Sequence, residues 1–133
     1  RVRFLGYVSD EELREGYLRA NVFCQPGTAE LQSLVTLEAM SASRPLVLAN
    51  ALALPHLVEE GKNGFLFEPG NSSDLAEKLG FILELPQAER KAMGAYSHEM
   101  VKKHAAKKTW DMFESLYTSS QKYYEFVASQ HKN

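Results

Sequence analysis

Two glutamates, Glu30 and Glu38, stand eight residues apart in the segment whose residue types could do chemistry. Glu30 follows an apolar run at 22–24 in a loop rich in turn residues, and the loop opens into a predicted helix that carries Glu38. The start of a helix presents free backbone N–H groups and the positive end of its dipole, which suit a phosphate. A carboxylate offers only acceptor oxygens, which suit sugar hydroxyls. Phosphate donors between two hydroxyl acceptors would fit a nucleotide-sugar, which contains a ribose, a diphosphate and a hexose.

The same segment carries a family resemblance. It resembles the signature of the retaining GT-B glycosyltransferases of family 4, the glycosyl transferases group 1. Here the signature reads Glu, seven residues, Glu, then Ala-Met and a small residue, and then Pro-Leu-Val-Leu-Ala at 45–49. Other matching blocks stand in family order at 2–8, 10–13, 49–58 and 61–67. The resemblance covers roughly residues 1–100 and is to part of the carboxyl-terminal domain, which binds the nucleotide-sugar.

The resemblance implies roles for individual residues. Glu30, the candidate catalytic residue, would bond hydroxyls of the donor hexose, and Glu38 would bond the ribose hydroxyls. Backbone N–H groups facing the diphosphate or the hexose would come from Gln32, Ser33, Leu34 and Val35. The turn formed by Tyr7 and Val8 would lie beside the nucleobase and contact it largely through the backbone.

Each of these roles has a structural alternative. Glu30 could be a solvated loop acid or a helix-capping acid. Glu38 could form a salt bridge with Arg44 or a nearby lysine, because acids are seldom fully buried unless they are paired. Tyr7 could be an ordinary surface tyrosine.

The chain departs from the family pattern at three positions where many members have glycine, namely Ser33, Ser43 and Leu52. Glycine lets backbone approach a ligand closely, so a serine at 33 bears on the fit of the donor. Glycine is also favoured at a helix end, where it adopts a left-handed conformation. We therefore expect Ser43 to cost stability more than function.

Composition excludes several classes of protein. The chain has 133 residues, of which 44% are hydrophobic and 24% charged, as in a soluble globular domain with a core of its own. Its net charge of −2 provides no basic field to recruit nucleic acid. The single cysteine, Cys24, allows no internal disulfide, and the four histidines lack the spacing of metal ligands. We expect neither metal nor cofactor. With no long apolar run and no signal peptide, we expect a cytoplasmic location.

The order of predicted elements indicates an α/β fold. Apolar strands at 2–5, 22–24, 46–49 and 65–67 are separated by helices, which is typical of a parallel sheet. Helices are predicted at about 10–19, 31–42, 55–60, 71–83, 88–104 and 108–129, and the first should bury Leu13, Tyr17 and Leu18. We predict a single domain over 1–133, with a partial Rossmann-like sheet of about four strands over about 1–70 and a helical tail over about 71–133.

The resemblance implies that this sheet lacks strands that a complete domain of the family has. A complete domain of the family has the strand order 3-2-1-4-5-6, and this chain would supply strands 3, 4, 5 and 6 only. The strand at 2–5 would then pair directly with 22–24, or a second copy of the chain would fill the exposed edge as a homodimer, or part of the parent protein is missing. The chain begins with Arg rather than Met, which favours a piece of a longer protein whose amino-terminal domain is missing.

Two functions follow. The first is the donor-binding part of a retaining hexosyltransferase, which moves a hexose from UDP- or GDP-hexose to an acceptor. The isolated piece should be inactive, because the family takes an Arg and a Lys from strands absent here and its acceptor site from the other domain. The second is a non-catalytic interaction module that uses an aromatic stripe around Trp110 and Phe113 in its helical tail. A sugar-nucleotide epimerase of the same fold fits the order of the glutamates less well.

Four lysines form a basic cluster before the tail, at 102, 103, 107 and 108. A solvated helix face is the simplest interpretation. The alternatives are contact with the amino-terminal domain and peripheral contact with the inner face of a membrane.

Overall fold

The structure, a computed structural model, describes residues 2–130, except for the side chains of 125–130. The chain divides into two compact units, residues 1–101 and residues 102–133. The elements in chain order are α1 (Asp10–Arg19), β1 (Phe23–Gln25), α2 (Leu34–Ser41), β2 (Leu46–Ala49), the short 3₁₀ helix η1 (Leu54–Leu57), β3 (Gly64–Phe67), α3 (Ser72–Glu84), α4 (Gln87–Val101), a second 3₁₀ helix η2 (Lys102–His104) and α5 (Ala106–Gln130).

The first unit is built on a parallel sheet in the order β1-β2-β3. Cys24 pairs with Val47, and Val47 pairs with Phe65. All four residues of β2 are buried, as expected for a central strand covered on both faces. This confirms the predicted α/β class, a parallel sheet flanked by helices.

The predicted strand at 2–5 is not formed, so the sheet has three strands in the described part of the chain rather than about four. The side chains of Val2, Phe4 and Leu5 are 81%, 94% and 66% exposed. A strand needs a neighbour to accept and donate its backbone hydrogen bonds, and β1 pairs only with β2 among the described strands. Direct pairing of residues 2–5 with β1 is therefore also wrong. Residues 2–5 carry the apolar pattern of a strand, but among the described residues no segment pairs with them.

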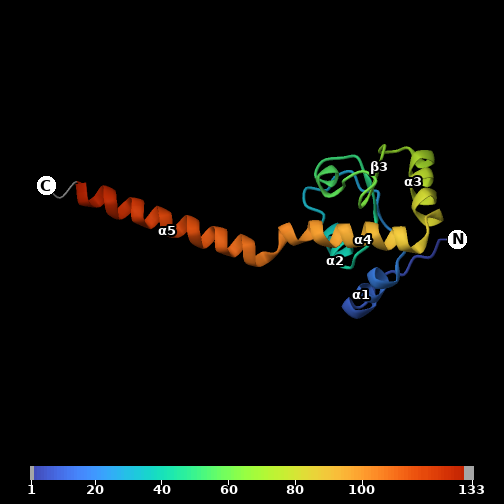
Figure 1. Cartoon of the computed structure of the whole chain (residues 1–133), viewed down its shortest axis with the longest axis horizontal. Helices are drawn as coiled ribbons and strands as arrows, with labels where there is room; N and C mark the ends of the chain where they lie inside the picture. The colour runs from blue at the N-terminus through green and yellow to red at the C-terminus, as the bar shows by residue number, and fades with distance from the viewer. Residues whose placement is uncertain (1, 131–133) are drawn as a thin grey trace. The chain divides into compact units, whose positions relative to one another are not determined.

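The core lies between the sheet and the helices of the first unit. α2 packs against α4, and α3 packs against β3 and β2. Figure 1 shows α3 beside β3. The buried apolar side chains are Ala39, Met40, Leu46, Val47, Leu48, Ala49, Leu54, Leu57, Phe67, Ile82 and Met93. α2 is shorter than the predicted helix, beginning at Leu34 and ending at Ser41.

α1 is held by its cap rather than by burial. The Ser9 hydroxyl accepts from the Glu12 N–H at 3.3 Å and the Glu12 carboxylate accepts from the Ser9 N–H at 2.9 Å, which makes a capping box. The Glu12 carboxylate also accepts from the Ser9 hydroxyl at 3.0 Å, and the hydrogen bonds that it receives from the Ser9 N–H and then from this hydroxyl lower the pKa of Glu12. The predicted buried stripe is wrong for Leu13 and Leu18, which are 43% and 52% exposed, because the described helices and strands leave that side of α1 uncovered. Tyr17 alone is half-buried.

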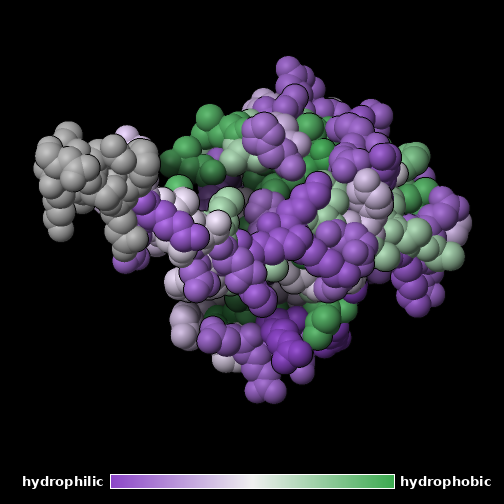
Figure 2. Space-filling model, turned by 60° about the vertical axis from the view of Figure 1, so that its left-hand side comes forward, coloured by the Kyte–Doolittle hydropathy of each residue, from purple (hydrophilic) through white to green (hydrophobic). Residues whose placement is uncertain are grey.

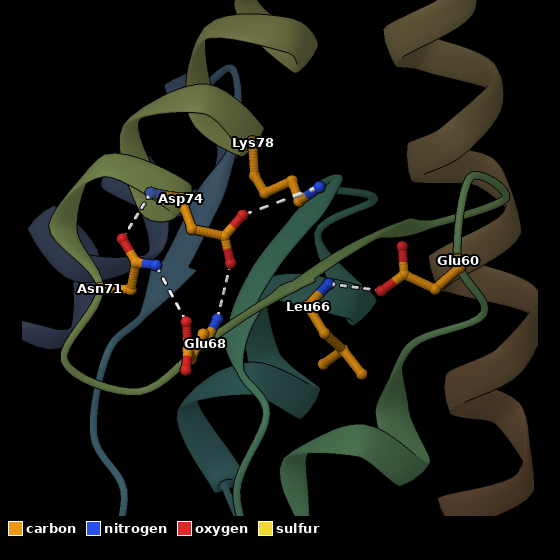
Figure 3. Close-up of polar contacts among 6 residues, drawn as sticks. All are labelled: Glu60, Leu66, Glu68, Asn71, Asp74 and Lys78. Atoms are coloured by element: carbon orange, nitrogen blue, oxygen red, sulfur yellow. Dashed lines mark hydrogen bonds and ion pairs between the residues drawn. The ribbon is translucent and has the colours of Figure 1, made fainter.

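Polar side chains fix the turn between β3 and α3 (Figure 3). The Glu68 N–H donates to Asp74 Oδ2 at 2.7 Å, and Asn71 caps α3 by accepting from the Asp74 N–H at 3.0 Å. Asn71 Nδ2 also donates to Glu68 Oε2 at 2.9 Å. Across β3, the Leu66 N–H donates to Glu60 Oε1 at 2.8 Å. Because this N–H already has an acceptor, the outer edge of β3 is closed to further pairing there.

The second unit consists of η2 and α5. Its large apolar side chains are exposed: Trp110 by 72%, Phe113 by 50%, Leu116 by 60% and Tyr117 by 73%. The predicted aromatic stripe is thus on the surface of α5, while the side chains of Phe126 and Val127 lie outside those described. Figure 2 shows hydrophobic side chains reaching the surface between hydrophilic ones on the face drawn.

Candidate functional site

The loop that carries Glu30 begins at the carboxyl end of β1. Gln25, the last residue of β1, donates from Nε2 to Glu30 Oε1 at 3.2 Å, and its own Oε1 accepts from the Gly27 N–H at 3.1 Å. These bonds fold the loop back on the strand and leave Glu30 half-buried. Ligands of open parallel sheets bind outside the carboxyl ends of the strands, so Glu30 lies where this class of fold places a ligand.

A second loop, which follows β2, is hydrogen-bonded to the backbone of Glu30. The Ala53 N–H donates to the Glu30 carbonyl at 3.2 Å. Leu52, next to Ala53, has a positive φ of 47° and a side chain that is 60% exposed. The loops at the ends of two neighbouring strands therefore meet at Glu30.

The start of α2 combines a buried anchor with free backbone donors. The Ser33 hydroxyl is 2.8 Å from the Thr36 hydroxyl, and Ser33 is only 1% exposed. Its φ is −80°, which any residue adopts, so serine in place of glycine causes no backbone strain here. The serine side chain is enclosed by protein. It therefore takes no space on the solvent side of the loop.

Of the four predicted backbone donors, one is already in use. The Leu34 N–H donates to the Gln32 carbonyl at 3.0 Å, within the turn that starts α2. Among the described hydrogen bonds, none satisfies the backbone N–H of Gln32, Ser33 or Val35. Three donors and the positive end of the α2 dipole thus remain for an anion.

Glu38 is exposed on α2 and is held by one neighbour. The Tyr17 hydroxyl donates to Glu38 Oε2 at 2.9 Å. Burial, and then the hydrogen bond to Glu38, raises the pKa of Tyr17 to about 12. The predicted alternative, a salt bridge with Arg44, is not formed, because Arg44 donates instead to the backbone carbonyls of Ala42 and Ala20 at 2.7 and 2.8 Å. Neither Glu30 nor Glu38 forms an ion pair with the residues described.

Tyr7 and Val8 lie in the segment before α1. Tyr7 is 99% exposed and Val8 is half-buried. Gly6, just before them, has a positive φ of 69°, and the chain bends at Tyr7. No described hydrogen bond connects either residue to Glu30 or Glu38.

A groove that the sequence did not predict opens between β3, α3 and α4. Its volume is about 480 Å³, and its lining includes Phe65, Phe81 and Met93. At its rim Lys62 Nζ lies 5.5 Å from the centre of the Tyr96 ring, and both side chains donate to Glu59, at 3.0 and 2.8 Å. None of the residues predicted to bind the donor lines this groove.

The described part of the chain offers no cluster of side chains for metal chemistry. No group of three or more His, Cys, Asp and Glu side chains there could hold a metal ion. Burial raises the pKa of the Cys24 thiol, in line with a small core residue. Within residues 2–130 none of the helices has the length and apolar character required to cross a bilayer.

The chain matches the family model described as glycosyl transferases group 1 over residues 1–100. It is 36% identical over 104 residues to the sulfoquinovosyl transferase SQD2 of Arabidopsis thaliana, covering 76% of this chain and 20% of that protein. It is 38% identical over 109 residues to the D-inositol 3-phosphate glycosyltransferase of Corynebacterium jeikeium, covering 82% and 25%. The chain thus spans a quarter or less of the length of these relatives.

Solved structures of similar fold are GT-B glycosyltransferases. The sucrose-phosphate synthase of Thermosynechococcus elongatus matches with a TM-score of 0.77 and 27% identity, over 90% of this chain and 31% of that one. The Anabaena protein HepE in complex with UDP-glucose matches with a TM-score of 0.76 and 27% identity, over 89% and 32%.

Proposed function

Because this chain belongs to the glycosyl transferases group 1 family, we propose that it is the donor-binding part of a retaining family 4 enzyme. That enzyme would move a hexose from a nucleotide-diphosphate sugar, UDP- or GDP-hexose, to an acceptor. The observation that carries the proposal is the start of α2, where the N–H groups of Gln32, Ser33 and Val35 have no described partner. In the sequence, Glu30 precedes these groups and Glu38 follows them. HepE, a structural relative, binds UDP-glucose.

The roles follow from the chemistry of each group. Glu38 would accept from the ribose hydroxyls, and the N–H groups of Gln32, Ser33 and Val35 would donate to the diphosphate. Glu30 would accept from hydroxyls of the hexose. Tyr7 and Val8 would lie beside the base, and the exposure of Tyr7 leaves it accessible to one.

This chain would contribute positioning and electrostatics rather than a complete active site. In a retaining transfer the bond from the sugar to the diphosphate breaks through an oxocarbenium-like transition state, and negative charge builds up on the departing diphosphate. The start of α2 supplies partial positive charge toward that group. The Arg and Lys that the family resemblance implies lie in strands outside this chain. We propose that residues 1–133 form one truncated domain that binds the donor and does not transfer the sugar.

Titration of the ¹⁵N-labelled chain with UDP and UDP-glucose, followed by NMR, tests this proposal. Glu38→Gln should weaken UDP binding about tenfold or more, since a hydrogen bond to a charged group contributes about 1.5–3 kcal/mol. Glu30→Gln should leave UDP binding within about twofold and remove any advantage of UDP-glucose over UDP. The control is Glu77→Gln, on the exposed side of α3. Unchanged UDP affinity in Glu38→Gln, or turnover of UDP-glucose by the unaltered chain, would contradict the proposal.

A second function, an interaction module, is favoured by one observation. Trp110 and Phe113 on α5 are exposed, and exposed aromatic patches mark interaction sites. The partner would be the amino-terminal domain of a longer parent or a second copy of the chain, with a cytoplasmic location and peripheral membrane contact through the nearby lysines. If this is the main function, Trp110→Ser should abolish assembly in sedimentation, and Glu38→Gln should change nothing.

A further inference from the structure

A hydrogen bond between Tyr17 and Glu38 joins two helices at the candidate site. The Tyr17 hydroxyl on α1 donates to Glu38 Oε2 on α2 at 2.9 Å, across 21 positions of sequence. The Tyr17 ring is anchored against Phe23 of β1, with ring centroids 6.0 Å apart at an angle of 49°. The hydroxyl is therefore held in place by packing of the ring and not by the hydrogen bond alone.

The contact leaves most of the carboxylate available. An ionised carboxylate can accept about four hydrogen bonds, and a phenol donates one. Glu38 itself is exposed, so its carboxylate keeps acceptor capacity for further hydrogen bonds. A free glutamate on a helix surface samples several rotamers, and fixing one of them before binding removes that cost from the binding step.

The environment keeps Tyr17 in the form that donates. Burial and the neighbouring carboxylate raise the pKa of Tyr17 to about 12, so its hydroxyl keeps its proton at neutral and moderately alkaline pH.

We propose that Tyr17 is a positioning residue for ribose recognition: its hydroxyl fixes the Glu38 carboxylate in the orientation that accepts the 2′- and 3′-hydroxyls of the nucleoside diphosphate. This inference rests on the proposed function, in which Glu38 binds the ribose. It adds a determinant on α1, outside the glutamate segment. Selectivity for a nucleotide that carries both ribose hydroxyls over one that lacks them then depends on a residue that touches neither hydroxyl.

The alternative is that the bond merely fastens α1 to α2. A purely structural bond would affect every ligand equally, whereas a positioning bond matters only when the ribose hydroxyls are present. Two ligands, UDP and 2′,3′-dideoxyuridine diphosphate, therefore separate the two roles. Tyr17→Phe is the suitable variant, because it keeps the ring that packs on Phe23 and removes only the hydroxyl.

The experiment measures the affinity of the 133-residue chain for both nucleotides by NMR titration, in Tyr17→Phe, Glu38→Gln and the double variant. We expect Tyr17→Phe to weaken UDP binding about three- to tenfold, as loss of one hydrogen bond does, and to change binding of the dideoxy nucleotide less than twofold. In the Glu38→Gln background the second change should add less than twofold. The matched control is Tyr96→Phe, whose hydroxyl donates to Glu59 at 2.8 Å elsewhere in the same unit and which should leave both affinities unchanged.

The outcomes distinguish this inference from the function on which it rests. If Glu38→Gln weakens UDP binding but Tyr17→Phe does not, or if Tyr17→Phe weakens both nucleotides equally, the positioning role is overturned and the proposed function stands. If Glu38→Gln leaves UDP binding unchanged, or the unaltered chain shows no binding of UDP at millimolar concentration, both are overturned.

Discussion

At the scale of single residues, two described residues other than glycine have the left-handed backbone conformation that favours glycine. Ser43 has a φ of 59° and Leu52 a φ of 47°. Ser43 ends α2 in a Schellman motif, because its N–H donates to the Met40 carbonyl at 2.9 Å and the Arg44 N–H donates to the Ala39 carbonyl at 3.0 Å. The hydrogen bonds of the motif are complete, but the left-handed residue carries a Cβ that costs roughly 1–2 kcal/mol.

We expect Ser43→Gly and Leu52→Gly each to raise the free energy of unfolding by about 1 kcal/mol, because glycine adopts a positive φ without strain. Urea denaturation of each variant measures this change. Ser41→Gly, at the exposed last residue of α2, is the control and should lower stability by about 0.5–1 kcal/mol. A loss of stability in Ser43→Gly as large as that in Ser41→Gly would refute the strain.

Tyr17 gives stability a dependence on pH. Its pKa in the folded chain is about 12 against an ordinary 10.0, so the folded state holds the proton more tightly than the unfolded state does. The contribution is therefore fully present below pH 10 and is lost as pH rises from about 10 to about 12.

Chemical denaturation at pH 9 and at about pH 11.5 should show a larger loss of stability in the unaltered chain than in Tyr17→Phe. Lys62, whose pKa is raised by Glu59, contributes an alkaline loss to both proteins and so cancels in the comparison. Tyr117→Phe, at an exposed position on α5, should behave as the unaltered chain. Identical pH profiles for Tyr17→Phe and the unaltered chain would count against the shifted pKa.

At the scale of elements, α2 is positioned by the close approach of α4 to its end. A Cβ added at Gly94 on α4 would lie 2.1 Å from the carbonyl oxygen of Ser43, which no real contact allows. Gly80, on α3, has no atom within 4 Å of such a Cβ. Substitution by alanine therefore tests helix packing at Gly94 and helix propensity at Gly80.

Gly94→Ala should lower the free energy of unfolding by about 3 kcal/mol or abolish folding, since backbone must move to relieve the overlap. Gly80→Ala should raise it by up to about 1 kcal/mol, because alanine favours a helix over glycine and meets no obstacle. Thermal unfolding followed by circular dichroism compares the two variants. Equal effects of the two substitutions would mean that α4 does not approach α2 as described.

At the scale of the whole molecule, the hydrophobic core belongs to one unit. The fully buried apolar side chains lie between Ala39 and Met93, and every described side chain of α5 is exposed. The first unit therefore has a core that does not draw on the tail.

A chain ending at residue 101 should keep the urea midpoint of the full chain within error, while losing helical signal in circular dichroism in proportion to the missing α5. The reason is that hydrophobic stabilisation scales with the apolar area buried, and the described tail buries little. NMR signals of the Val47 and Ile82 methyl groups report the core directly. A truncated chain with a collapsed midpoint or broadened core signals would show that residues 102–133 contribute to that core.

The sequence by itself determined the local character of this protein. The apolar runs that form β2 and β3, and the helices that start near residues 10 and 71, depend on neighbours within a few positions. Both were predicted from the sequence. The left-handed conformation of Ser43 could be expected only from the family resemblance, because many members have glycine at this helix end and serine itself does not predict a positive φ.

Only the tertiary structure decided which residues contact each of these predicted elements. Residues 2–5 are apolar like a strand, but no described strand pairs with them. Leu13 and Leu18 have the spacing of a buried stripe, but both are exposed. The Tyr17 hydroxyl meets Glu38 across 21 positions, and Arg44 turns to backbone carbonyls instead of to that acid. Periodicity specifies which face of an element is apolar or charged, whereas its partner is set by chain topology, on which local sequence carries no signal.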